Sequence, residues 1–131
     1  YPFFETTNEG AYKLFLKRLN ATPRSETQPP WGVMSLFRYA GDPKNEKLVA
    51  WKAKATWFKP ADVKKALAAV IADKKTNWMA RTAAVESFAV LGGTKSELEA
   101  LKQGYDGKDL TDQHVVKAID DAAAKAPSPA R

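Results

Sequence analysis

The sequence predicts an all-α protein, a compact helical bundle of about six to seven helices. Three observations support this class. Apolar residues recur at helical spacing in several segments, capping signals stand at the ends of those segments, and the one alternating segment has no second strand with which to pair. Hydrophobic residues make up 44% of the 131 residues, enough to bury one core. We expect a single helical domain over residues 1–126, with a subdivision near residues 93 and 94 as the alternative, and a flexible tail at 127–131.

The first helix is predicted at about residues 7–20. Thr6 and Glu9 have the spacing of a capping box, and apolar residues follow at i, i+3, i+4 and i+7. Residues 21–30 are polar and rich in proline, which predicts a loop. A short helix is then expected over residues 31–40, because a proline precedes it and a Gly-Asp-Pro stop follows it.

Residues 46–58 fit two patterns. Apolar residues recur there at helical spacing, but Trp51 and Trp57 also belong to a run that alternates with polar residues, as on a half-buried strand. The high alanine and lysine content favours a helix, and the chain offers no second strand of similar pattern. We therefore expect a helix here.

The next two helices have clear boundary signals. Pro60 suits the first turn of one, and a continuous apolar stripe follows over Val63 to Ile71. Asn77 is the expected N-cap of the other, which Gly92 and Gly93 should end. Both helices are expected to contribute to the core.

Two further helices complete the prediction. Thr94 and Glu97 have capping-box spacing, and the helix that they begin should present Leu98 and Tyr105 on one side. Because about two residues separate this helix from the one before it, the two should form an antiparallel hairpin. The last helix is expected over residues 115–126.

From about residue 45 to residue 126, the helices can be assigned alternating roles in a repeated hairpin. Three residue pairs recur at a spacing of 35 or 36 residues: Val63 and Leu98, Trp78 and His114, and Arg81 and Lys117. This part of the chain resembles HEAT-type helical repeats, in which hairpins stack and the first helix often carries an arginine and small residues. The resemblance implies that Trp78 and Arg81 serve in packing and anchoring, and that the protein binds other macromolecules.

The pattern departs from that family in three ways. Its period is shorter than the roughly 40–47 residues of HEAT and armadillo repeats, at most two and a half units are visible, and residues 1–44 do not take part. An irregular helical bundle predicts the same caps and apolar stripes, and it remains the alternative.

The chain is also similar in general architecture to the PsbQ-type extrinsic lumenal proteins of photosystem II. The similarity consists of small size, basic charge, absence of cysteine, predicted helicity and the start "YPFFETTNEG", which looks like a processed N-terminus. It implies export or import into an organelle, with the thylakoid lumen as the specific expectation.

The longest apolar run has seven residues, Ala66 to Ala72, whereas a membrane span needs about 20.

No catalytic, cofactor or metal site is predicted, and we expect the protein not to be an enzyme. There is no cysteine and a single histidine, His114, which we expect on the surface of the last helix. "GGTKS" at residues 92–96 lacks phosphate-loop spacing, and glycine ends and threonine caps explain it. Asp106, Asp109 and Asp112 do not have the spacing of a calcium-binding loop.

The basic segment is the strongest functional signal. The net charge is +6, and residues 44–75 hold nine lysines but only three acidic residues. Lys64 and Lys65 point away from the apolar stripe of their helix, so both should be exposed. The predicted partner-binding residues are Lys44, Lys47, Lys52, Lys54, Lys59, Lys64, Lys65, Lys74 and Lys75, with Trp51 and Trp57 as hydrophobic anchors.

The expected partner is an acidic protein surface in a larger assembly, on which the protein would be a non-catalytic accessory or scaffolding subunit. The alternative is a basic helical module that binds nucleic acid. Lysine is far more frequent than arginine in this chain, whereas base and phosphate contacts favour arginine. The lysines could also serve only to keep a small helical protein in solution.

Overall fold

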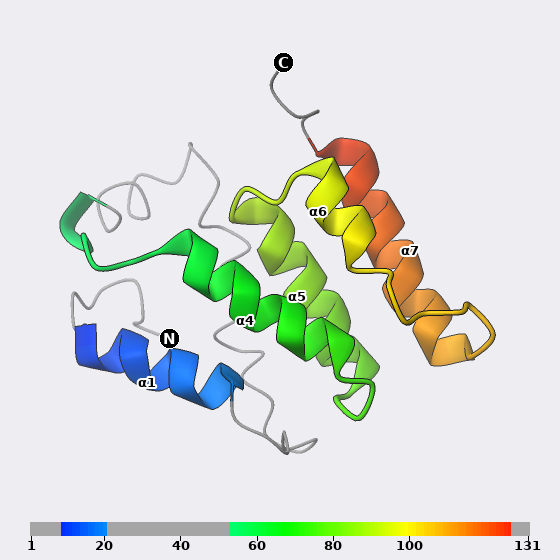
Figure 1. Ribbon diagram of the computed structural model, residues 1–131, viewed down its shortest axis with the longest axis horizontal. Coiled ribbons are helices and arrows are strands. Elements are labelled where there is room, and N and C mark those ends of the chain that lie inside the picture. The colour runs from blue at the N-terminus through cyan, green and yellow to red at the C-terminus, as the bar shows by residue number, and fades with distance from the viewer. Residues whose placement is uncertain (1–8, 21–52, 127–131) are drawn as a thin grey trace.

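The computed structural model describes residues 9–20 and 53–126, and all regular structure in these residues is helical (Figure 1). The predicted all-α class is therefore confirmed for this part of the chain. The helices are α1 (Glu9–Asn20), α4 (Pro60–Ala72), α5 (Trp78–Val90), α6 (Lys95–Ala100) and α7 (Leu110–Lys125). The helix expected at residues 31–40, Thr6 of the first capping box and the tail at 127–131 lie outside the described residues.

The helix predicted for residues 46–58 does not reach Phe58. Ala53 and Lys54 are helical, but the chain then turns, and the backbone N–H of Phe58 donates to the carbonyl of Ala55 at 3.0 Å. Pro60 accounts for the extended conformation of Lys59, because a proline disfavours the helical conformation of the residue before it. Lys59 is extended, with φ of −120° and ψ of 101°. The chain must leave one helix before it can begin α4.

Local signals determine both ends of α5. The side chain of Asn77 accepts a hydrogen bond from the backbone N–H of Met79 at 2.8 Å, which confirms the predicted N-cap. Gly92 has a φ of +94°, in the left-handed region that favours glycine. Gly93 packs tightly, because a Cβ on it would lie 2.7 Å from the Phe88 ring. The predicted glycine end is thus confirmed.

α6 begins as predicted but ends early. The Thr94 hydroxyl accepts from the backbone N–H of Glu97 at 3.2 Å, and the Glu97 carboxylate accepts from the backbone N–H of Thr94 at 3.0 Å. The helix ends at Ala100 and gives way to tighter turns, so the expected extension to Tyr105 is wrong. Tyr105 instead donates its hydroxyl proton to the carbonyl of Ile71 at the end of α4.

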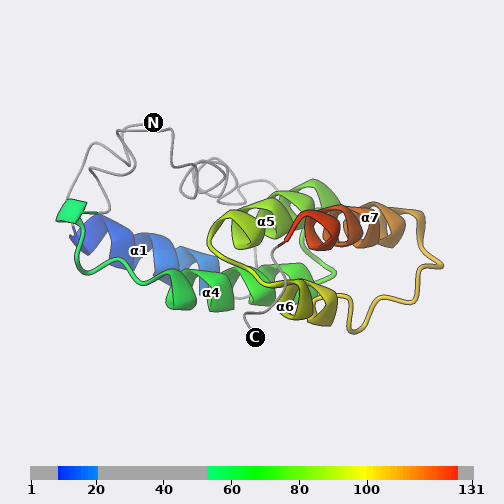
Figure 2. The ribbon, with the colours of Figure 1, turned by 90° about the horizontal axis from the view of Figure 1, so that it is seen from above.

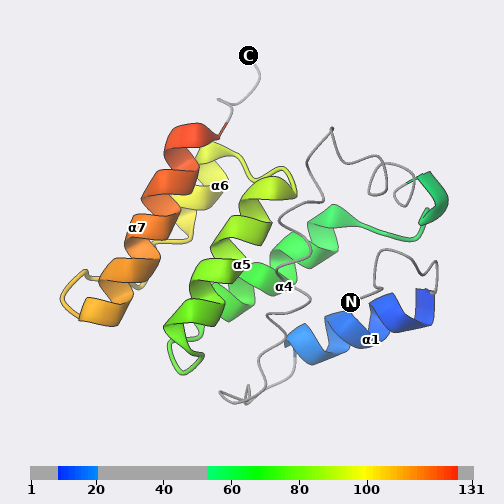
Figure 3. The same ribbon diagram turned by 180° about the vertical axis from the view of Figure 1, so that it is seen from behind.

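The helices form two layers. Figure 2 shows α4 and α6 in one layer and α5 and α7 in the other, and Figure 3 shows α5 and α7 side by side, running in the same direction. α1 lies beside α4. The fully buried side chains come from all four later helices: Val63, Leu67, Val70, Ile71, Val85, Leu98, Val115 and Ile119. Each contributes roughly 1.5–3 kcal/mol by leaving water, so this core orients the surfaces described below.

Candidate partner-binding surface

The predicted basic segment is divided between described and undescribed residues. Lys44, Lys47, Trp51 and Lys52 lie outside the described residues. The other predicted lysines lie before, within and after α4, a helix of 13 residues and therefore about 20 Å long. Of these, the exposed ones are Lys54, Lys59, Lys65, Lys74 and Lys75.

Lys64 differs from the expectation of an exposed side chain. Only 18% of its side chain is exposed, and its ammonium group lies 3.2 Å from Oε1 of Glu97 on α6. It also lies 5.6 Å from the centre of the Phe88 ring on α5. The side chain is largely buried because it lies between Phe88 of α5 and Glu97 of α6. The backbone N–H of Thr94, and after it the ammonium group of Lys64, hold the pKa of Glu97 below its ordinary value.

Trp57, one of the two predicted anchors, is half-buried and packs against the hydrophobic core. Ala55, two residues earlier, is almost fully buried. The indole therefore helps to attach the segment before α4 to the bundle, and only part of its surface is accessible to a partner.

Lys74 joins a network at the end of α4. Its ammonium group lies 3.0 Å from Oδ2 of Asp112 on α7, and this hydrogen bond raises the pKa of Lys74. Asp112 is only 5% exposed and also faces Arg81, whose Nη1 lies 3.4 Å from Oδ1 of Asp112. Lys74 is therefore less free to contact a partner than its position in the sequence implies.

Arg81 is the centre of this network. The residue is only 3% exposed, and Nε donates to the carbonyl of Thr76 at 2.9 Å while Nη1 donates to the hydroxyl of Tyr105 at 3.0 Å. Because these partners come from the α4–α5 loop, the segment after α6, and α7, the cation joins three parts of the chain. A buried charge satisfied in this way serves architecture, as predicted for Arg81.

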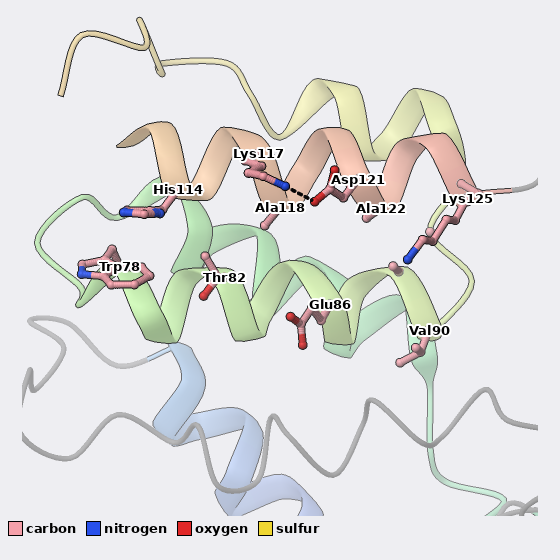
Figure 4. Close-up of a pocket in the computed structure, with 13 residues that line it drawn as sticks. Trp78, Thr82, Glu86, Val90, His114, Lys117, Ala118, Asp121, Ala122 and Lys125 are labelled. Atoms are coloured by element: carbon pink, nitrogen blue, oxygen red, sulfur yellow. Dashed lines mark hydrogen bonds and ion pairs between the residues drawn. The ribbon is translucent and has the colours of Figure 1, made fainter. Parts of the chain in front are cut away.

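A groove of about 660 Å³ lies on the outer side of the other layer, between α5 and α7 (Figure 4). At one end, the rings of Trp78 and His114 stack with centroids 4.6 Å apart and an interplanar angle of 20°. His114 is exposed, as predicted. The remaining lining residues are Thr82, Glu86, Ala89, Val90, Gly93, Lys117, Ala118, Asp121, Ala122, Lys125 and Ala126.

Charged side chains form the walls of the groove, and small alanine side chains form its floor. On α7, Lys117 and Asp121 form an ion pair at 2.9 Å, in which both side chains are mostly exposed. Ala118, Ala122 and Ala126 follow one another at intervals of four residues and are half-buried. Sequence reasoning missed this surface, although the alanines beside charged residues at the same helical spacing were a signal for it.

Among residues 9–20 and 53–126, no three His, Cys, Asp or Glu side chains gather where they could hold a metal ion. No helix in the same residues is long and apolar enough to cross a membrane.

No family model, curated protein or solved structure matches the chain.

Proposed function

We propose that this protein is a non-catalytic accessory or scaffolding subunit that docks electrostatically onto an acidic protein surface of a larger assembly. One observation carries the proposal. Lys54, Lys65 and Lys75 are exposed and have no acidic partner in the described part of the chain, whereas Lys64 and Lys74 are paired. Lys54 stands six residues before α4, Lys65 lies within it, and Lys75 stands three residues after it.

Lysines before, on and after a helix about 20 Å long suit the scale of a protein interface, which typically covers about 800 Å² on each partner. Exposed ammonium groups steer association and set orientation, and they act over a screening length of about 8 Å at physiological salt. The docking should therefore be fast at low salt and lost near 1 M salt, where the screening length is about 3 Å.

We further propose that the helices from α4 to α7 alternate in the roles of a repeated hairpin in the manner of HEAT-type repeats, with α5 and α6 as the two helices of one hairpin. Residues at equivalent positions support it, since Val63 and Leu98 are both fully buried and Trp78 lies against His114. Extrinsic subunits of photosystem II, of the PsbQ type, are the class of accessory protein to which the chain is similar in size, charge and helicity.

The test compares two triple variants of the full chain with equal charge changes. One carries Lys54→Glu, Lys65→Glu and Lys75→Glu, and the control carries Lys17→Glu, Lys95→Glu and Lys108→Glu, which are also exposed and without acidic partners in the described residues. Each immobilised protein is exposed to extract from its own source at low salt, and the retained polypeptides are identified by mass spectrometry.

We expect the wild type and the control to retain the same acidic polypeptides, and the first variant to lose them. Equal retention by all three proteins would overturn the proposal. A gel shift with a short DNA duplex or RNA that only the first variant loses would assign the lysines to nucleic acid instead.

A further inference from the structure

We propose that the groove between α5 and α7 receives an amphipathic helix from a partner protein. The helix lies antiparallel to α5 and α7, and acidic residues of its first turn lie beside Lys125. This surface is separate from the lysines of α4, so the proposal stands or fails independently of the charge docking described above.

The dimensions of the groove suit a helix. Its α5 wall extends from Trp78 to Val90, which is about 18 Å or three helical turns. Packed helices have axes 8–10 Å apart, and small side chains at the contact permit the shorter distances in that range. Ala118 and Ala122 supply such a floor (Figure 4), and Ala89 also lines the groove.

The apolar contacts are concentrated at the N-terminal ends of α5 and α7. Trp78 lies there against His114, and the two large hydrophobic side chains that are exposed in the described residues are close by in the sequence. Met79 follows Trp78 and is 41% exposed, while Leu110 precedes His114 by one helical turn and is 72% exposed. An apolar face on the partner helix would cover Trp78 and continue along the alanines to Val90.

Charge selects the direction of the bound helix. Lys125 is exposed at the far end of the groove and has no acidic partner in the described residues. The carboxyl ends of the parallel helices α5 and α7 lie at the same end and carry partial negative charge. The N-terminus of an antiparallel helix has the complementary partial positive charge, and acidic residues in its first turn pair with Lys125.

The other charges of the groove do not compete with this arrangement. Lys117 and Asp121 neutralise each other across one turn of α7. Glu86 on the opposite wall already has an interaction within the chain. Lys125 is therefore the cation that remains to orient a ligand.

Two synthetic peptides of 15 residues provide the probes. Both have leucine on one helical face, charged residues in the first and last turns, and alanine at the remaining positions. One carries glutamates in its first turn and lysines in its last turn, and the other has these charges exchanged. Their affinities for the full chain are measured at low salt by fluorescence anisotropy, for the wild type, Lys125→Glu, Ala122→Trp and the control Lys95→Glu. Circular dichroism verifies the helicity of each variant.

We expect the peptide with glutamates first to bind the wild type and the control about three- to fivefold more tightly than the other, the size typical of an exposed ion pair with a helix-dipole contribution. Lys125→Glu should reverse that preference, and Ala122→Trp should abolish binding by filling the groove. Binding of neither peptide, or equal binding of both to the wild type, would overturn the proposal. Concentration-dependent dimerisation that Ala122→Trp abolishes would also overturn it, because a second copy would then occupy the groove.

Discussion

Trp78 and His114 stack face to face at 4.6 Å, although they stand 36 residues apart in the chain. Each belongs to the first turns of its helix, α5 or α7, so the contact aligns the N-terminal ends of two parallel helices. It also closes one end of the groove (Figure 4). The pair links the packing of the outer layer to its binding surface.

Removal of this stack should weaken the fold moderately. An aromatic pair contributes about 0.5–1.5 kcal/mol beyond the area that it buries. We therefore expect His114→Ala to lower the free energy of unfolding in urea by about that amount, whereas His114→Phe should retain most of it. Equal stability of His114→Ala and the wild type would show that the contact contributes nothing in solution.

Loss of Asp112 should be far more damaging than loss of an exposed acid. Asp112→Ala leaves the guanidinium of Arg81 buried without its carboxylate, and breaking a buried pair in this way costs about 3–5 kcal/mol. Asp121→Ala removes a mostly exposed pair on the same helix and should cost less than about 1 kcal/mol. Thermal unfolding followed by circular dichroism would compare them. Similar losses for the two variants would contradict the structural role given to Arg81.

Acid should destabilise the protein partly through Glu97. The folded state lowers the pKa of this carboxyl below its ordinary value of 4.5, so the unfolded state binds the proton more readily. The resulting stability is present above pH 4.5 and is lost as the pH falls through the folded pKa. Glu97→Gln keeps a capping partner for Thr94 but removes the titration. The midpoint of thermal unfolding should fall as the pH is lowered from about 6 to about 3, and this fall should be smaller in Glu97→Gln than in the wild type. An equal fall in the midpoint for Glu97→Gln and the wild type would show that Glu97 does not contribute to acid sensitivity.

The two glycines after α5 should fail for different reasons. Gly93→Ala would bring a Cβ within 2.7 Å of the Phe88 ring, and such overpacking typically costs about 1–3 kcal/mol. Gly92→Ala meets no atom within 4 Å, but its φ of +94° is unfavourable for alanine and should cost about 1 kcal/mol. Because that Cβ would also lie 2.9 Å from the backbone carbonyl oxygen of Phe88, Phe88→Leu should relieve only part of the cost of Gly93→Ala, and none of the cost of Gly92→Ala, in a double-mutant cycle of unfolding free energies. Equal relief of both would contradict the steric explanation.

Several elements could be predicted because their causes are local. Asn77 and Thr94 cap helices through atoms two or three residues away, and Pro60 acts on its immediate neighbour. The apolar stripe of α4 is a property of helical spacing alone, and its predicted members Val63 to Ile71 include the buried residues. Tertiary context instead ended α6 early, where Tyr105 reaches the carbonyl of Ile71.

The sequence by itself determined the helical class, the caps, the lysine-rich segment in the middle of the chain and the absence of cysteine chemistry. Only the tertiary structure decided which lysines are free. Lys64 and Lys65 are neighbours with the same chemistry, yet Lys64 meets Glu97 from 33 residues away and Lys65 meets solvent. The groove has the same origin, since its walls come from two helices that the buried core and the Trp78–His114 stack bring together. Capping depends on near neighbours along the chain, whereas ion pairing and surface shape depend on neighbours in space.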